Sequence, residues 1–115
     1  MSEASAYKKA PVGKAFQMIQ ALREAHSDMQ IETAQLFMLI AMNPGITMRE
    51  LRDLSEQPQG KVSRNVALLS EWRTAEEPGL GWVTSQIDPN ERRRKVLDLT
   101  QQGSDMAKRL IALVS

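Results

Sequence analysis

The residues best suited to binding chemistry lie between Thr47 and Trp72, in the stretch TMRELRDLSEQPQGKVSRNVALLSEW. Its pattern predicts two helices with a tight break at Gln57-Pro58. In the second helix, Val62, Val66 and Leu69 share one face. A helix with an aliphatic inner face and small, polar and basic outer groups is what a DNA major groove accepts. The outward residues are Gln59, Gly60, Lys61, Ser63 and Arg64.

The first of these two helices is expected to begin with a capping box, in which Thr47 pairs with Glu50. Thr47 and Arg49 then stand at its start, where free backbone amides can hold a phosphate. The helix must be short, because the break follows after about two turns. Its predicted buried side consists of Met48, Leu51 and Leu54. The two helices together predict a helix-turn-helix.

A second basic group is the unbroken run Arg92, Arg93, Arg94 and Lys95. Predicted strands at 81–88 and 95–100 flank it, which makes it part of a β-hairpin with a loop at 88–94. Arginine guanidinium groups suit a narrow, negatively charged DNA minor groove. A solvated turn is the plain alternative, and the flanking strands favour DNA contact. The inward residues of the first strand are expected to be Val83, Ser85 and Ile87.

Composition limits the other functions. The 115 residues indicate one domain with an ordinary share of hydrophobic (42%) and charged (25%) residues, and the net charge is +1. There is no cysteine and only one histidine, so we expect no metal and no cofactor. No nucleophile–base pair is evident, so an enzyme is the weakest hypothesis. No apolar run approaches the roughly 18 residues of a membrane span, which predicts a soluble, cytoplasmic protein.

Three further helices are expected to support these parts. One spans about residues 10–26, and one runs from Ile31 to Met42 as the central buried helix. The last begins after an N-cap at Thr100 and covers 101–115. Ile46 is free to form a very short strand. The predicted face of the central helix is Ile31, Ala34, Gln35, Met38, Leu39 and Met42.

This order of elements is that of a winged helix-turn-helix, mostly helical with a small β-hairpin. The sequence resembles the MarR family of bacterial transcriptional regulators. The strongest match is DPNERRRKVLDLTQQG at 88–103, an Asp-Pro-x-acidic-Arg-Arg turn followed by Leu-Thr-x-x-Gly. The pattern at 59–69 and Gly45-Ile46-Thr47 add to it, and together the matches span 44–103.

The resemblance implies a homodimer on a pseudo-palindromic duplex, with each recognition helix in a major groove and each wing in a minor groove. It also implies that Glu91 braces a wing arginine through an ion pair. Two features depart from the family. The link 73–80 is longer than usual, and there is room for one helix after the wing instead of two. The family's small-molecule pocket involves those terminal helices, so the sequence leaves an effector open.

The first and last helices carry more aliphatic residues than the small core can cover, which predicts dimerisation through them. Folding back within one chain is the alternative. The predicted dimerisation residues are Val12, Phe16, Ile19, Leu22, Met106, Leu110, Leu113 and Val114. A protein-interaction or replication and partition module is the competing function, because winged helices serve both.

Overall fold

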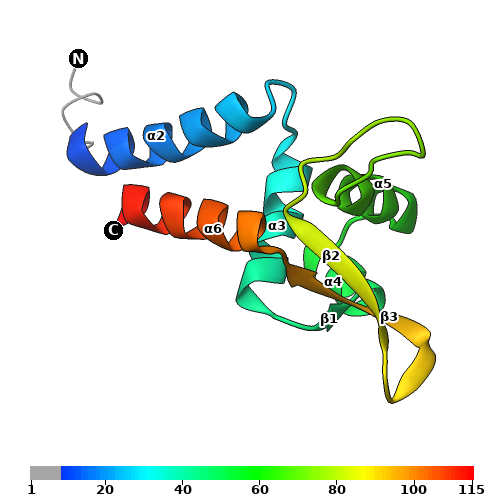
Figure 1. Cartoon of the computed structure of the whole chain (residues 1–115). Coiled ribbons are helices and arrows are strands. Elements are labelled where there is room, and N and C mark those ends of the chain that lie inside the picture. The colour runs from blue at the N-terminus through cyan, green and yellow to red at the C-terminus, as the bar shows by residue number, and fades with distance from the viewer. Residues whose placement is uncertain (1–8) are drawn as a thin grey trace.

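The computed structural model describes residues 9–115 and has the predicted order of elements (Figure 1). Two helices come before the first strand, two more lie between the first and second strands, and one follows the third; the hairpin of the last two strands projects from one end. The fold is a winged helix-turn-helix, as predicted. The elements are α2 Lys9–Ala25, α3 Ile31–Met42, β1 Ile46–Thr47, α4 Met48–Ser55, α5 Gln59–Leu69, β2 Val83–Asp88, β3 Glu91–Leu99 and α6 Gln101–Val114.

Helix α3 is the centre of the core. It contacts α4, α5, α6 and β3, and its Leu36, Phe37 and Ile40 are almost inaccessible to solvent. The Phe37 ring lies 4.9 Å from that of Trp82, at a tilted angle that suits aromatic pairs. The prediction of a central buried helix is confirmed.

The predicted faces of two helices were partly wrong. Ile31 and Met42 are 85% and 69% exposed, and α3 instead buries a stripe that includes Thr33. In α4, Leu51 is fully buried but Leu54 is 56% exposed. An almost uniformly apolar helix such as α3 carries no amphipathic signal strong enough to orient it, and both ends of α3 extend past the core that covers its middle.

The three strands form one antiparallel sheet in the order β1-β3-β2. Ile46 pairs with Leu97, and Leu97 also faces Ser85 of β2. Val83 and Leu97 are buried, but Ile87 is 62% exposed, so the predicted inward face of β2 holds only at its start. The reason is that the hairpin leaves the body of the protein after its first residues and has no core beneath its outer half (Figure 1).

The turn of the hairpin is much shorter than the predicted loop of 88–94. Asp88 pairs with Glu91 across Pro89-Asn90, and a register shift between Ile87 and Asp88 precedes it. The Asp88 carboxylate accepts the Asn90 N–H at 2.9 Å, as in an Asx turn. Strand β3 therefore begins at Glu91, and the basic run lies on a strand, where alternate side chains point to opposite faces.

Helices α2 and α6 lie side by side and run in opposite directions (Figure 1). Near one end of the pair, Lys14 Nζ donates to the carbonyl oxygen of Ser115, and towards the other Arg109 pairs with Glu24 at 3.0 Å. Thr100 caps α6 by accepting the Gly103 N–H. Gly103 itself is required by contact, because a Cβ there would clash with the carbonyl oxygen of Trp82.

Helix α5 ends at Leu69 and not at the predicted Trp72. The backbone N–H groups of Leu80 and Trp82, which follow the link, donate to the carbonyl groups of Leu68 and Leu69. If the helix continued, these carbonyl groups would accept hydrogen bonds from its next turn. The link is itself ordered, since Arg73 N–H donates to the Glu77 carbonyl at 2.8 Å. The long link thus forms a small hairpin that closes against the end of the helix.

Candidate DNA-binding surface

The start of α4, the start of α5 and the wing strand β3 together form a cleft of about 810 Å³. Five basic side chains line it against two acidic ones, so its lining is positively charged. Such a charged concave surface focuses the field that attracts a polyanion. The lining residues are Thr47, Met48, Arg49, Glu50, Arg52, Gln59, Val62, Glu91, Arg93, Arg94 and Lys95.

The predicted capping box fixes one edge of this cleft. Thr47 Oγ1 accepts the Glu50 N–H at 3.0 Å, and the Glu50 carboxylate accepts the Thr47 N–H at the same distance. The bond from the Thr47 backbone N–H, and after it the Thr47 hydroxyl group, lower the pKa of the Glu50 carboxyl below its ordinary value. Arg94 of the wing contributes in the same direction across the cleft. Glu50 is therefore ionised at neutral pH and keeps the start of α4 in place.

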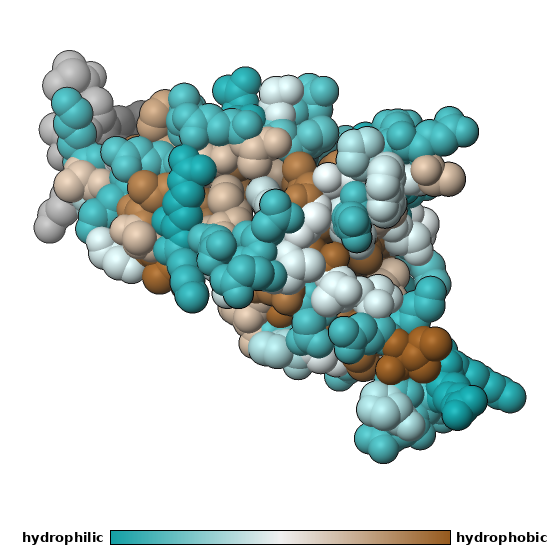
Figure 2. Space-filling model, in the orientation of Figure 1, coloured by the Kyte–Doolittle hydropathy of each residue, from teal (hydrophilic) through white to brown (hydrophobic). Residues whose placement is uncertain are grey.

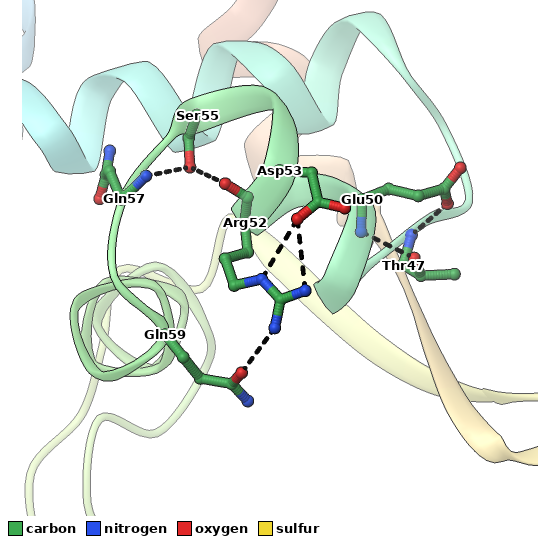
Figure 3. A network of polar contacts seen from close by, with 7 residues as sticks. All are labelled: Thr47, Glu50, Arg52, Asp53, Ser55, Gln57 and Gln59. Atoms are coloured by element: carbon green, nitrogen blue, oxygen red, sulfur yellow. Dashed lines mark hydrogen bonds and ion pairs between the residues drawn. The ribbon is translucent and has the colours of Figure 1, made fainter.

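The turn between α4 and α5 is held by side-chain and backbone bonds (Figure 3). Glu56 adopts a left-handed conformation, with φ 56°, and its N–H donates to the Arg52 carbonyl. Ser55 Oγ donates to that same carbonyl and accepts the Gln57 N–H. The Gln57 amide group then donates to Gln35 Oε1 of α3 at 2.8 Å. This bond ties the turn to the core helix α3.

Helix α5 divides as predicted into a buried and an outward side. Val62, Val66 and Leu69 belong to the core. Asn65 is also buried and accepts a hydrogen bond from Thr33 Oγ1 at 2.8 Å, so it is unsuited to DNA contact. The exposed residues are Gln59, Gly60, Ser63 and Arg64.

Lys61 has a partner within the chain. Its ammonium group lies 2.7 Å from Glu32 Oε2 of α3, and both side chains are partly exposed. The hydrogen bond from Lys61 lowers the pKa of the Glu32 carboxyl. Any contact of Lys61 with a phosphate must therefore compete with this ion pair.

Gly60 has open space around it. A Cβ there would meet only the Arg64 guanidinium, at an ordinary distance of 3.6 Å. Packing within the chain does not explain this glycine, and both interpretations stand: close approach to a ligand, or a tolerated glycine in the first helical turn.

Arg64 lies away from the main cleft. It lines a second, smaller hollow of about 280 Å³ on the other side of α5, together with residues of the α2–α3 connection such as His26 and Asp28. The structure thus brings Thr47, Arg49 and Gln59 together with the wing but directs Arg64 elsewhere.

The wing carries its basic residues along β3, and its projection is mostly hydrophilic with one exposed apolar group beside the hydrophilic side chains (Figure 2). The expected ion pair between Glu91 and a wing arginine is not formed: Glu91 Oε1 accepts the backbone N–H of Arg93 at 3.4 Å. Asp88 instead lies 3.8 Å from Arg94. Among residues 9–115, Arg92 and Arg93 have no ion-pair partner. Both guanidinium groups are exposed.

Two basic lining residues, Arg52 and Lys95, were not among the residues predicted to bind DNA. Arg52 follows Arg49 by three positions, a spacing that places both on one side of α4. That spacing was the available signal. Lys95 ends the basic run for which DNA contact was favoured, and it also begins the predicted strand 95–100.

The predicted dimerisation residues fall into two groups. Leu22, Met106 and Leu110 are at most 8% exposed, because α2 and α6 pack against each other and the core. This part of the prediction needs correction, since these three side chains are already covered within one chain. Leu113 is partly buried. The side chains that stay exposed are Val12, Phe16, Ile19 and Val114, with Ile111 in addition.

Residues 9–115 contain neither a membrane-spanning helix nor a metal-binding cluster. No helix there combines the length and apolar character needed to cross a bilayer. In the same part of the chain, no three acidic or histidine side chains are grouped as a metal ion would require.

No protein-family model and no curated protein sequence matches this chain. Solved structures do. Wild-type MarR from E. coli in its apo form aligns at a TM-score of 0.64 with 22% identity, covering 89% of this chain and 71% of that one. An S. aureus MepR–DNA complex aligns at 0.65 with 16% identity, covering 86% and 77%. A mutant E. coli MarR complexed with operator DNA aligns at 0.65 with 22% identity, covering 89% and 69%.

These likenesses confirm the predicted fold as that of MarR-type winged helices. The aligned part is most of this chain and about 70 to 77% of theirs. At such low identities the likeness concerns the path of the backbone. Function is therefore inferred from the residues of the cleft.

Proposed function

We propose that this protein is a cytoplasmic transcriptional regulator that binds double-stranded DNA in a sequence-specific manner as a homodimer. Helix α5 would enter the major groove through its outward residues, and the wing arginines would reach the adjacent minor groove. The regulator would use no cofactor and no catalytic group. Thr47 and Arg49 would contact the phosphates between the two grooves.

The observation that carries this proposal is the charged cleft between α4, α5 and β3. Two separate elements contribute cations to one concavity: Arg49 and Arg52 from α4, and Arg93, Arg94 and Lys95 from the wing. A protein-interaction module has no need of basic groups at both the helix pair and the wing. Two proteins with the same fold, MepR and a mutant MarR, have been crystallised with DNA.

The homodimer rests on apolar side chains left uncovered on the paired helices α2 and α6. Val12, Phe16 and Ile19 recur at spacings of four and three and are all more than half exposed. Ile111 of α6 is 61% exposed. Patches of this kind on a small protein mark interaction surfaces, and a two-fold pair of reading helices would match a pseudo-palindromic site.

The test is a titration of the full chain against labelled duplexes at several salt concentrations, followed by fluorescence anisotropy. Specific binding with a steep negative salt slope is expected, because bound phosphates release their counterions. The double variant Arg92→Ala/Arg93→Ala should weaken binding and flatten the slope by about 0.9 for each phosphate that the variant no longer neutralises. Replacing two exposed residues away from the cleft, as in Gln17→Ala/Gln20→Ala, is the matched control and should change neither quantity.

Absence of duplex binding at low salt would contradict the proposal and favour the protein-interaction module. Salt-dependent binding without any sequence preference would retain DNA as the partner but remove operator-specific regulation. If binding is sequence-specific but the double variant has the affinity and salt slope of the wild type, α5 contacts the DNA and the wing arginines do not.

A further inference from the structure

Arg52 and Gln59 both line the cleft, and a hydrogen bond between them joins the two helices of the helix-turn-helix (Figure 3). Arg52 Nη1 donates to Gln59 Oε1 at 3.0 Å. The remaining nitrogens of the guanidinium face Asp53, whose Oδ1 accepts from Nε and Nη2 at 3.3 Å each. Asp53 thereby holds the guanidinium plane, and Arg52 in turn holds the end of Gln59.

The orientation of the Gln59 amide follows from chemistry. A guanidinium group has five N–H donors and no acceptor. Only the oxygen of the Gln59 amide can face it, and the two N–H donors must point the other way. Figure 3 shows the Gln59 nitrogen directed away from Arg52. Since Gln59 is the exposed first residue of α5, its free donors face the solvent in front of the recognition helix.

We infer that Arg52 is a positioning residue that restricts Gln59 to hydrogen-bond acceptors on the bases of the major groove. This inference rests on the proposed function and specifies it. An unrestricted glutamine offers both its oxygen and its nitrogen to adenine, to N6 and N7 together. With its oxygen held by Arg52, Gln59 offers donors alone. The groups that can accept them are guanine O6 and N7, adenine N7 and thymine O4, and the amino group of cytosine is excluded.

A phosphate contact by Arg52 would have a different signature. Removing a phosphate contact weakens binding to all sequences about equally, whereas removing a positioning residue changes the preference at one base pair. The geometry favours positioning, because three guanidinium nitrogens of Arg52 already have partners in residues 53 and 59.

The experiment selects binding sites from a randomised duplex library with the full-length protein and then measures affinities for single-base variants of the preferred site. Gln59→Ala locates the base pair that Gln59 reads, as the position where preference is lost. Arg52→Met, which keeps an unbranched side chain without its donors, should broaden the preference at that position to include cytosine and favour adenine more strongly. In the Gln59→Ala background, Arg52→Met should produce no further change at that position.

Gln59→Glu supplies the reverse case. One carboxylate oxygen would still accept from Arg52. The other would replace the donating nitrogen of Gln59 by an acceptor, which would select the cytosine amino group. The preference at the Gln59 position should move towards cytosine by roughly tenfold, the size of one good base contact. Arg49→Met is the matched control, because Arg49 lines the same cleft and has no bond to Gln59. It should lower affinity for all duplexes evenly.

The outcomes separate the two proposals. If wild-type protein binds no duplex, the proposed function fails and the inference fails with it. If wild-type protein binds with sequence preference but Arg52→Met lowers all affinities evenly, as Arg49→Met does, only the positioning role is overturned. Circular dichroism of each variant confirms folding, and the side-chain amide NMR signal of Gln59 in the free protein should shift in Arg52→Met and stay in place in Arg49→Met.

Discussion

The two ends of this molecule differ in the kind of side chains that they expose to solvent. The reading end consists of α4, α5 and the β2–β3 hairpin. Its cleft is lined mainly by charged and polar side chains, and some of them are held by hydrogen bonds such as Arg52–Gln59. Leu54 and Ile87 are exposed apolar side chains of this end. The terminal-helix end consists of α2 and α6 and leaves large apolar side chains such as Phe16 in solvent. The charged cleft of the first end suits a charged partner. The exposed apolar side chains of the second end are not covered by any other part of the described chain. In the proposed function, DNA and a second copy of the chain would bind at opposite ends.

The largest expected effect comes from charging the terminal-helix end. Phe16→Glu places a carboxylate in the proposed interface and should convert the dimer to a monomer. Affinity for a duplex with two half-sites should then fall by about 10² to 10⁴, because each subunit loses the effective concentration supplied by its partner. Sedimentation velocity measures the oligomeric state, and anisotropy measures the affinity.

Gln17→Glu is the control for Phe16→Glu, with the same added charge one residue along the helix on another exposed face. It should stay dimeric and bind as wild type. A wild-type protein that sediments as a monomer, or a Phe16→Glu variant that stays dimeric, would show that the exposed apolar face has another purpose.

The joint between the two ends is expected to be the next most sensitive place. Gly103→Ala would drive a Cβ into the carbonyl oxygen of Trp82, where α6 meets the start of the wing. Backbone must shift to relieve this contact, and unfolding free energy should fall by about 3 kcal/mol. Chemical denaturation monitored by tryptophan fluorescence measures the change.

Gly13→Ala is the paired variant, since Gly13 lies within α2 with nothing within 4 Å of its added Cβ. It should stabilise the protein by about 0.5–1 kcal/mol through helix propensity. Equal, small effects of the two substitutions would mean that α6 can move away from the wing at little cost, and the two ends would then be independent.

A third, smaller effect concerns the core beneath the reading helix. Thr33→Val removes the hydroxyl that donates to buried Asn65 Oδ1 and leaves that oxygen unpaired. The expected loss is about 1–2 kcal/mol of unfolding free energy. Thr33→Ser keeps the hydroxyl and should recover most of it. If Thr33→Val is as stable as the wild type while Thr33→Ser is destabilised, the methyl packing of Thr33 matters and the hydrogen bond to α5 does not.

Sequence reasoning located the elements better than their orientation. Capping and turn residues such as Thr47, Pro58 and Thr100 act locally, so helix starts were predicted nearly to the residue. The boundaries of α5 and β3 depended on distant partners: Leu80 and Trp82 take the carbonyls at the end of the helix. No local pattern contains that competition.

The candidate site was predictable by residue type but not by pairing. Basic residues at the helix pair and wing are visible in the sequence, and the cleft does bring Arg49, Gln59 and Arg93 together. The ion pair of Lys61 with Glu32 and the bond of Arg52 with Gln59 join residues 29 and 7 positions apart, respectively. Side-chain partners at such separations follow from helix packing angles, which a periodicity does not specify.

The smallest expected effect lies within the reading end, where Lys61 is held by a carboxylate and Arg92 is not. Glu32→Gln removes the charge that faces Lys61 at 2.7 Å and frees the ammonium group for a phosphate. DNA affinity at low salt should rise a few-fold, and the salt slope should steepen by about 0.9 per subunit. Anisotropy titrations at pH 7 measure both quantities.

The pH of that measurement follows from the sign of the pKa shift. The bond from Lys61 lowers the pKa of Glu32 from its ordinary value of 4.5, so the ion pair is fully formed above that value and is lost as pH falls through the lowered one. At pH 7 the wild-type ion pair is therefore intact. The comparison with Glu32→Gln then measures the effect of removing a charged carboxylate, because Glu32 is not protonated at that pH. In a Lys61→Met background, Glu32→Gln should leave the salt slope unchanged; if it steepens the slope there as well, the added affinity comes from lost repulsion between Glu32 and DNA, and Lys61 is only its structural partner.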